Sequence, residues 1–129
     1  MAYVDIVTAL AVLQFIVFGF RVGGARGRYG VKAPAVAGNE IFERYFRVQQ
    51  NTLEQLIVFL PGLYLFSHYL NPLVAAGLGA VYLTGREVYA VTYVKDPAKR
   101  GPGYGLTFLP TVILVLGGLF GAVRQLLGH

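Results

Sequence analysis

The segment of residues 55–85 reads QLIVFLPGLYLFSHYLNPLVAAGLGAVYLTG. It contains no Asp, Glu, Lys or Arg over 31 residues, although about 20 apolar residues already suffice for a helix to cross the hydrocarbon core of a bilayer. Asn71-Pro72 lies near its middle, and the residue before a proline is disfavoured in a helix. The stretch therefore predicts two membrane-spanning helices joined by a tight turn.

Two further uncharged runs, residues 6–20 and 101–123, flank this hairpin, and each predicts one more span once the polar residues at its ends are included. The chain has 129 residues and is 56% hydrophobic but only 13% charged, which is about half of the charge of a usual soluble domain. We therefore predict one domain, residues 1–129, that is an all-α membrane protein. Its fold would be a four-transmembrane-helix bundle of left-handed up-and-down topology, with helices over about 3–27, 40–69, 72–95 and 103–126.

The basic residues cluster in two segments. Six of the eleven Lys and Arg residues fall within residues 21–47, four within residues 86–100, and only Arg124 lies elsewhere. Because basic loops stay on the cytoplasmic side of a membrane, we expect both segments to be cytoplasmic and both termini to lie on the opposite side. One interpretation is that these segments act only as topology signals and as contacts with lipid headgroups. No nucleic-acid-binding motif accompanies them, so nucleic acid is not an expected partner.

Polar residues on the second predicted helix indicate a site. Arg47, Asn51 and Glu54 follow the spacing i, i+4, i+7, so they share one helix face. The helix turns apolar after Glu54, which places this carboxylate just inside the edge of the bilayer. A carboxylate at that depth is expensive and is expected to face a partner or a wet cavity.

A second polar stripe ends the third predicted helix, where Arg86, Tyr89 and Tyr93 follow the spacing i, i+3, i+7. Both stripes lie at the cytoplasmic ends of their helices, so we expect them to line one pocket. Guanidinium groups, amides, a carboxylate and phenol hydroxyls suit a ligand with several carboxylates, an amine and peptide bonds. A purely structural interpretation stays open, in which Glu54 pairs with Arg47 or Arg86 and the tyrosines form an aromatic belt.

Two segments resemble a known family. Residues 47–54, RVQQNTLE, resemble the helix-2 signature Arg-x-x-x-Asn-x-x-Glu of the MAPEG superfamily, the membrane-associated proteins in eicosanoid and glutathione metabolism. Residues 85–93, GREVYAVTY, followed by DPAKR at 96–100, resemble the end of its helix 3 and the loop beyond. The short segments QNTLE at 50–54 and PAKRG at 97–101 are similar to those of the microsomal glutathione transferase 3 branch, with leukotriene C4 synthase a nearby relative.

The resemblance implies a membrane-bound glutathione transferase that acts as a homotrimer and needs no metal. Glutathione, the co-substrate, would bind at subunit interfaces near the cytoplasmic border, and its thiolate would be conjugated to lipophilic electrophiles; the enzyme could also reduce lipid hydroperoxides. By the same resemblance Arg100 is the catalytic residue that stabilises the thiolate. The positions that match glutathione-contacting residues of the family are Arg26, Arg47, Gln49, Asn51, Glu54, Arg86, Tyr89 and Tyr93.

The sequence departs from the leukotriene synthase pattern at two positions. That group has a second arginine, proposed to act on the lipid substrate, where this chain has Gly27 after Arg26. It also has a tyrosine where this chain has Gln55 after Glu54. The first departure argues against leukotriene synthesis, and the second predicts a different thiol contact or pocket wall.

Two other functions stay open. The chain could be a non-catalytic lipid-binding or scaffold member of the superfamily. A small multidrug transporter that uses Glu54 as a proton or cation site is disfavoured, because Arg47 and Arg86 share the depth of this carboxylate. The expected partners are further copies of the chain, membrane lipids and the electrophile. Because no retention signal follows at the C-terminus, we expect a bacterial inner membrane.

Overall fold

The structure, a computed structural model, describes residues 1–128. Within these residues all regular structure is helical, which confirms the all-α prediction. α1 begins one residue earlier and ends two residues later than predicted, and α4 begins two residues earlier. The elements are α1 (Ala2–Tyr29), α2 (Glu40–Tyr69), α3 (Pro72–Lys95), the short 3-10 helix η1 (Pro97–Lys99) and α4 (Gly101–Leu126).

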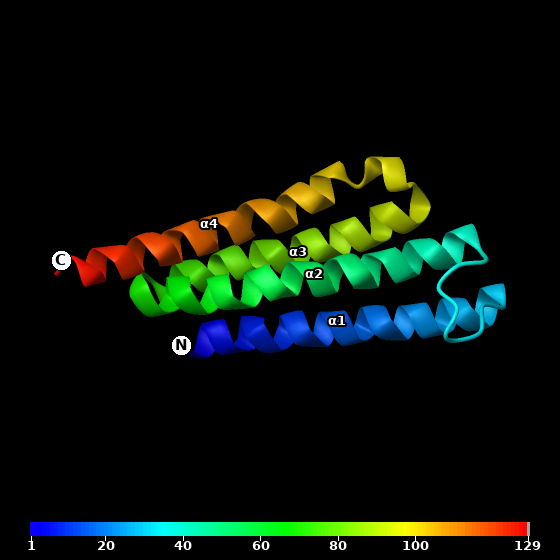
Figure 1. Cartoon of the computed structure of the whole chain (residues 1–129), viewed down its shortest axis with the longest axis horizontal. Coiled ribbons are helices and arrows are strands. Elements are labelled where there is room, and N and C mark those ends of the chain that lie inside the picture. Colours follow the sequence, from blue (N-terminus) through cyan, green and yellow to red (C-terminus); the bar gives the residue numbers. More distant parts are fainter. Residues whose placement is uncertain (129) are drawn as a thin grey trace.

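The four helices run alternately up and down along one long axis (Figure 1). Both ends of the chain and the α2–α3 turn lie at one end of the bundle, whereas the α1–α2 loop and η1 lie at the other. α2 and α3 pack on each other, and both also pack against α1 and against α4. The two basic segments predicted from the sequence therefore lie at the same end of the bundle, which we call the basic end.

Local chemistry explains where the helices begin and end. The Asn39 side chain accepts a hydrogen bond of 2.9 Å from the backbone N–H of Phe42 and caps α2. The Asn71 side chain accepts two such bonds, of 2.8 and 3.0 Å, and Pro72 follows it at the start of α3. These positions suit Asn and Pro, because a cap satisfies free N–H groups and proline has none to satisfy. Gly30 ends α1 in the left-handed region, with φ of 67°.

Two helical stretches are long and apolar enough to cross a membrane, Ala2–Tyr29 and Pro97–Leu126, with mean hydropathies of 2.0 and 2.2. α2 and α3 do not meet this criterion, because polar side chains enter their apolar segments; that they also cross the membrane stays a prediction. Large apolar side chains point outward along the bundle, among them Phe20 and Ile57, which are 75% and 68% exposed. Such surfaces are typical of contact with lipid or with another protein chain.

A close approach between α3 and α4 supports the basic end of the bundle. A Cβ atom placed on Gly85 would lie 2.7 Å from backbone and side-chain atoms of Leu106, and one on Gly103 would lie 2.5 Å from the backbone of Tyr89. Small residues allow helix backbones to come this close. The two glycines therefore bring the side chains of α4 within reach of the polar stripe on α3.

Candidate functional site

Arg86, on α3, is a completely buried cation with a relative exposure of 0%. Its Nε donates a hydrogen bond of 2.9 Å to Thr107 Oγ1 on α4. Its Nη1 donates to Asn51 Oδ1 and Thr52 Oγ1 on α2, at 2.8 and 3.2 Å. The guanidinium group thus joins α2, α3 and α4 at one point inside the bundle.

No carboxylate pairs with Arg86 in the part of the chain that the structure describes. The ion pairs found there are Arg21–Glu87 and Arg44–Glu40. The Nη2 atom of Arg86 is buried and has no hydrogen-bond partner among residues 1–128. A buried charge without a counter-charge costs several kcal/mol. The positive potential of Arg86 is therefore uncompensated, and an anion bound nearby would stabilise it.

Asn51 of α2 is oriented by its hydrogen bond with Arg86. Its side chain is 9% exposed, and its Oδ1 already accepts the hydrogen bond from Arg86. The amide nitrogen Nδ2, which can only donate, is the group that remains for a ligand. Arg86 therefore fixes the Asn51 amide with its oxygen toward the guanidinium group, and the N–H groups stay free to donate to an anion.

Aromatic rings extend this cluster along α3 and α4. The Cζ atom of Arg86 lies 4.4 Å from the centre of the Tyr89 ring, which is buried. Tyr89 stacks on Tyr93 with ring centres 5.4 Å apart, and Tyr104 of α4 lies 6.4 Å from Tyr89. A cation held over a tyrosine ring is stabilised by the electrons of the ring. The three phenols provide a continuous aromatic wall beside Arg86.

Two more cations lie on the surface next to this wall. Arg47 and Tyr93 both line a cavity of about 370 Å³ at the basic end, together with residues of η1 and the α1–α2 loop. Arg100 is exposed, and its Nη1 donates a hydrogen bond of 2.9 Å to the Pro97 carbonyl. The charges of Arg47 and Arg100 both act on the Tyr89 hydroxyl. Positive residues from both predicted motifs are therefore close enough to the same phenol for their charges to reach it.

Glu54 is exposed on α2 and forms no ion pair within residues 1–128. The interpretation in which Glu54 pairs with Arg47 or Arg86 inside one chain is therefore wrong. Its spacing still places it on the face of α2 that carries Arg47 and Asn51. An exposed carboxylate on this face is available for an ammonium group of a ligand.

Gln49 and Arg26, both predicted to contact the same ligand, lie on the other side of α2. The Gln49 Nε2 atom is 3.1 Å from the position that a Cβ atom on Gly19 of α1 would take. The Cζ atom of Arg26 lies 4.9 Å from the centre of the Phe42 ring, and Phe42 and Gln49, seven residues apart, share one face of α2. Arg26 Nη1 also donates a hydrogen bond of 2.7 Å to the Ala35 carbonyl, which holds the α1–α2 loop.

The sequence reasoning missed three residues of this site, Thr52, Thr107 and Tyr104. Thr52 and Thr107 accept from Arg86, and each also donates to a backbone carbonyl of its own helix, at 2.8 and 3.0 Å. The signal available was the spacing of the polar side chains in the uncharged run of residues 101–123, where Tyr104, Thr107 and Thr111 follow i, i+3, i+7. Among residues 1–128, no three His, Asp or Glu side chains gather as metal ligands would.

Comparison with known protein families matches residues 4–120 to the MAPEG family. The chain belongs to the MAPEG family. An uncharacterized protein of Synechocystis sp. is 51% identical over 121 residues, which cover 94% of this chain and 88% of that protein. Microsomal glutathione S-transferase 2 of Homo sapiens is 37% identical over 94% of this chain and 82% of its own length. The Mus musculus protein of the same name is 40% identical over 86% of this chain and 78% of its own length.

Membership of the MAPEG family confirms the resemblance seen in the two motifs, since the match covers both. Together with the two apolar helices it supports a location in a membrane. The two mammalian relatives are called microsomal glutathione S-transferase 2, so the predicted branch, microsomal glutathione transferase 3, stays a prediction. In this MAPEG chain, four of the predicted site residues form one connected cluster, Asn51, Arg86, Tyr89 and Tyr93.

Proposed function

We propose that this MAPEG protein is a membrane-bound glutathione transferase that activates glutathione as a thiolate and conjugates it to lipophilic electrophiles. The observation that carries the proposal is the buried guanidinium group of Arg86, which has no carboxylate partner in residues 1–128 and holds Asn51 through Oδ1, so that the Asn51 N–H groups are free to donate. Relatives named microsomal glutathione S-transferase 2 support the same activity. Reduction of lipid hydroperoxides by the same thiolate is a second reaction of the proposal.

The groups on the Arg47 face of α2 fit glutathione, a tripeptide with two carboxylates, an ammonium group and a thiol. Arg47 and the Asn51 amide would bind a carboxylate, because an arginine fork matches carboxylate geometry. Glu54 would bind the ammonium group, and Tyr93 would donate from its hydroxyl. Arg86 itself is buried, so its role would be to orient Asn51 and to supply positive potential rather than to touch the tripeptide.

Arg100 is the proposed catalytic residue. A free cysteine thiol has a pKa of about 8.5, and an adjacent guanidinium group lowers the pKa of a thiol because it stabilises the anion. Each unit of that shift corresponds to about 1.4 kcal/mol. The exposed position of Arg100, next to the Tyr89 wall, leaves its charge free for this role. The thiolate then forms a carbon–sulfur bond with the electrophile, the leaving group departs as an anion, and the thiol proton goes to water.

The proposed assembly is a homotrimer in which each site lies between two subunits. Its support is the position of the predicted contacts. Arg47, Asn51 and Glu54 lie on one face of α2, whereas Gln49 lies on the face toward α1, and Arg26 of α1 packs on Phe42 of that same face. One chain cannot bring both groups to one small ligand. A cyclic assembly could, because in a ring the second face of one subunit meets the first face of the next. The basic end is proposed to face the cytoplasm, in a bacterial inner membrane.

The activity is tested with detergent-purified protein. Addition of glutathione should produce thiolate absorbance in the ultraviolet, and 1-chloro-2,4-dinitrobenzene should be conjugated with release of chloride. Arg100→Ala should lose most of both signals, whereas Arg124→Ala, which removes the same charge at the other end of α4, should keep them. Glutathione binding without conjugation of any electrophile in a panel would favour the non-catalytic lipid-binding alternative. Full activity of Arg100→Ala would remove Arg100 from the mechanism.

The shared site has its own test. Arg100→Ala inactivates one half of the proposed site, and Gln49→Glu places a carboxylate in the other half, where it repels the substrate. Each variant alone should be inactive, but a trimer mixed from equal amounts of both should recover about a quarter of the activity, because a quarter of the interfaces join two intact halves. If each site lies within one subunit, the mixture stays inactive.

A further inference from the structure

A groove between α1, α2 and α3 borders the cluster that holds Tyr89 and Tyr93, but neither tyrosine lines it and it has no role in the proposed activity. It has a volume of about 380 Å³, which falls within the range of ordinary ligand pockets. Helical spacing places two of its α3 residues, Val91 and Lys95, away from the Arg86 stripe, whereas Ala90 follows Arg86 at i+4 and forms the edge of the groove nearest that stripe. The groove is lined by Phe18, Arg21, Tyr45, Val48, Ala90, Val91, Val94 and Lys95.

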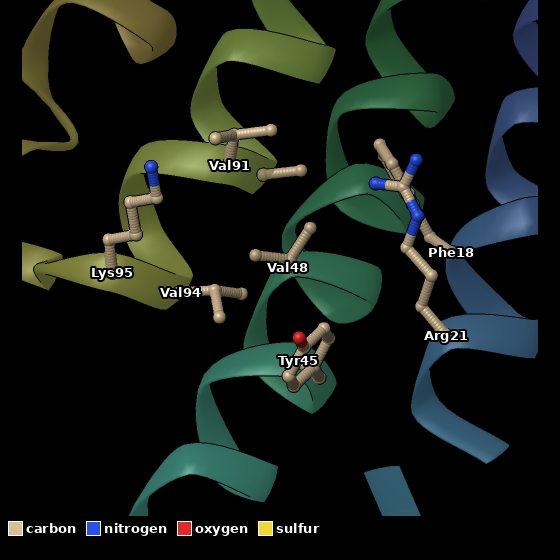
Figure 2. A pocket seen from close by; sticks show the side chains of 8 residues that line it. Phe18, Arg21, Tyr45, Val48, Val91, Val94 and Lys95 are labelled. Carbon is tan, nitrogen blue, oxygen red and sulfur yellow. The ribbon is translucent and has the colours of Figure 1, made fainter. Parts of the chain in front are cut away.

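The groove combines an apolar floor with charged walls. Figure 2 shows Arg21 of α1 and Lys95 of α3 on opposite sides, with the side chains of Val48, Val91 and Val94 between them. Arg21 is the first charged residue after the uncharged run of residues 6–20. The groove therefore sits where the apolar part of the bundle meets its basic end, the depth at which lipid headgroups begin.

The charges that face the groove are mostly positive. Arg21 donates a hydrogen bond of 2.7 Å to Glu87 and is thereby partly neutralised. Lys95 is exposed and forms no ion pair in residues 1–128. The Cζ atom of Arg28 lies 5.4 Å from the Tyr45 ring, which adds a third cation at this rim. Three cations against one carboxylate leave an excess of positive charge.

Arg44 makes the C-terminal end of α3, next to this groove, more favourable for an anion. Its Nη1 donates to the carbonyls of Val94 and Lys95, at 3.0 and 3.3 Å. The last carbonyls of a helix carry a partial negative charge that would repel an anion. Arg44 offsets this charge and leaves the Lys95 ammonium group free to bind outward.

We propose that this groove binds an anionic phospholipid of the leaflet at the basic end, with its phosphate between Arg21 and Lys95 and an acyl chain along Phe18, Val48 and Val91. The apolar floor favours a lipid over a free inorganic anion, because a free anion gains nothing from burial against valine side chains. The cations favour an anionic lipid over a zwitterionic one. The proposal needs the bundle to lie in a membrane, but it does not depend on glutathione transfer.

The test is native mass spectrometry of the detergent-purified protein with dioleoylphosphatidylglycerol, dioleoylphosphatidylcholine or inorganic phosphate. We expect retention of phosphatidylglycerol above phosphatidylcholine and no competition by phosphate. Lys95→Gln should lower retention about fivefold, since each Lys or Arg near anionic lipid contributes about 1 kcal/mol. Lys32→Gln, the same change on the exposed α1–α2 loop, should not.

Two further variants extend the test: one should increase the retention of phosphatidylglycerol, and the other changes the shape of the groove without changing its charge. Glu87→Gln frees Arg21 and should raise retention of phosphatidylglycerol, whereas Val91→Phe keeps every charge, fills the apolar floor and should lower it. Conjugation activity should persist in Lys95→Gln, which separates this proposal from the transferase. The proposal would be overturned by equal losses in Lys95→Gln and Lys32→Gln, or by equal binding of both lipids. It would also be overturned if a second copy of the chain covered the groove, which would shield Lys95 from amine-reactive reagents.

Discussion

The Nη1 atom of Arg86 donates a hydrogen bond of 2.8 Å to the Oδ1 atom of Asn51, across the contact between α3 and α2. Neither residue could take its present role alone. Arg86 is buried without an acid and needs acceptors, while Asn51 needs a fixed amide if it is to offer N–H groups to a ligand. The pair thus links a buried charge to an amide whose N–H groups are free to donate.

Asn51→Asp should separate stability from binding. A carboxylate at position 51 would pair with Arg86 and compensate its buried charge, so the unfolding temperature in detergent should stay the same or rise. The outward N–H donor would be replaced by a negative charge, and glutathione should bind at least about tenfold more weakly, since a hydrogen bond to a charged group contributes about 1.5–3 kcal/mol. Thermal unfolding and glutathione titration measure the two effects. Unchanged affinity would show that the Asn51 amide does not contact glutathione.

Arg86→Met should preserve the fold and abolish glutathione binding. Replacing a buried charge by an apolar side chain of similar volume is often neutral or stabilising, and Thr52 and Thr107 keep their hydrogen bonds to backbone carbonyls. Asn51 loses its only side-chain partner in residues 1–128, so its amide is no longer oriented. We expect the free energy of unfolding to change by less than about 2 kcal/mol. A strongly destabilised variant that still binds glutathione while folded would contradict the role of Arg86 in orienting Asn51 for binding.

Gly103→Ala should destabilise the α3–α4 contact. The added methyl group would lie 2.5 Å from the backbone of Tyr89, and overpacking of this kind costs about 1–3 kcal/mol. Gly105→Ala is the matched control, because nothing lies within 4 Å of a Cβ atom there and alanine is the better helix former. We expect Gly103→Ala to lower the unfolding temperature and Gly105→Ala to leave it unchanged or raise it. Equal effects would mean that the close approach at Gly103 does not matter.

Asn71→Ala should weaken the cap of α3 without affecting the site at the basic end. The substitution removes the acceptor of two backbone N–H groups and should cost about 1 kcal/mol. Asn71→Asp keeps an acceptor and should retain most of the stability. Conjugation activity at a temperature well below unfolding should be the same in both variants. A loss of activity with Asn71→Ala would show that the two ends of the bundle are coupled.

Much of the helical framework could be predicted because it depends on local chemistry. The uncharged runs and the Asn71-Pro72 turn signal follow from single residues and their neighbours, and the structure has α2 and α3 on either side of that turn. The polar faces could also be predicted, since helical periodicity alone puts Arg47, Asn51 and Glu54 in one stripe. The burial of Arg86 could not, because it depends on Thr52 and Thr107 from two other helices.

Composition and periodicity are enough to predict that the chain is helical and apolar, that its basic residues gather in two segments, and that two polar stripes lie at the ends of helices. The tertiary structure decided that Asn51 is oriented by Arg86, that Glu54 is left unpaired within residues 1–128, and that Gln49 faces α1. The physical reason is that periodicity fixes the angle of a side chain around its own helix axis. Which neighbouring helix stands at that angle, and how closely it approaches, depends on packing between segments far apart in the chain.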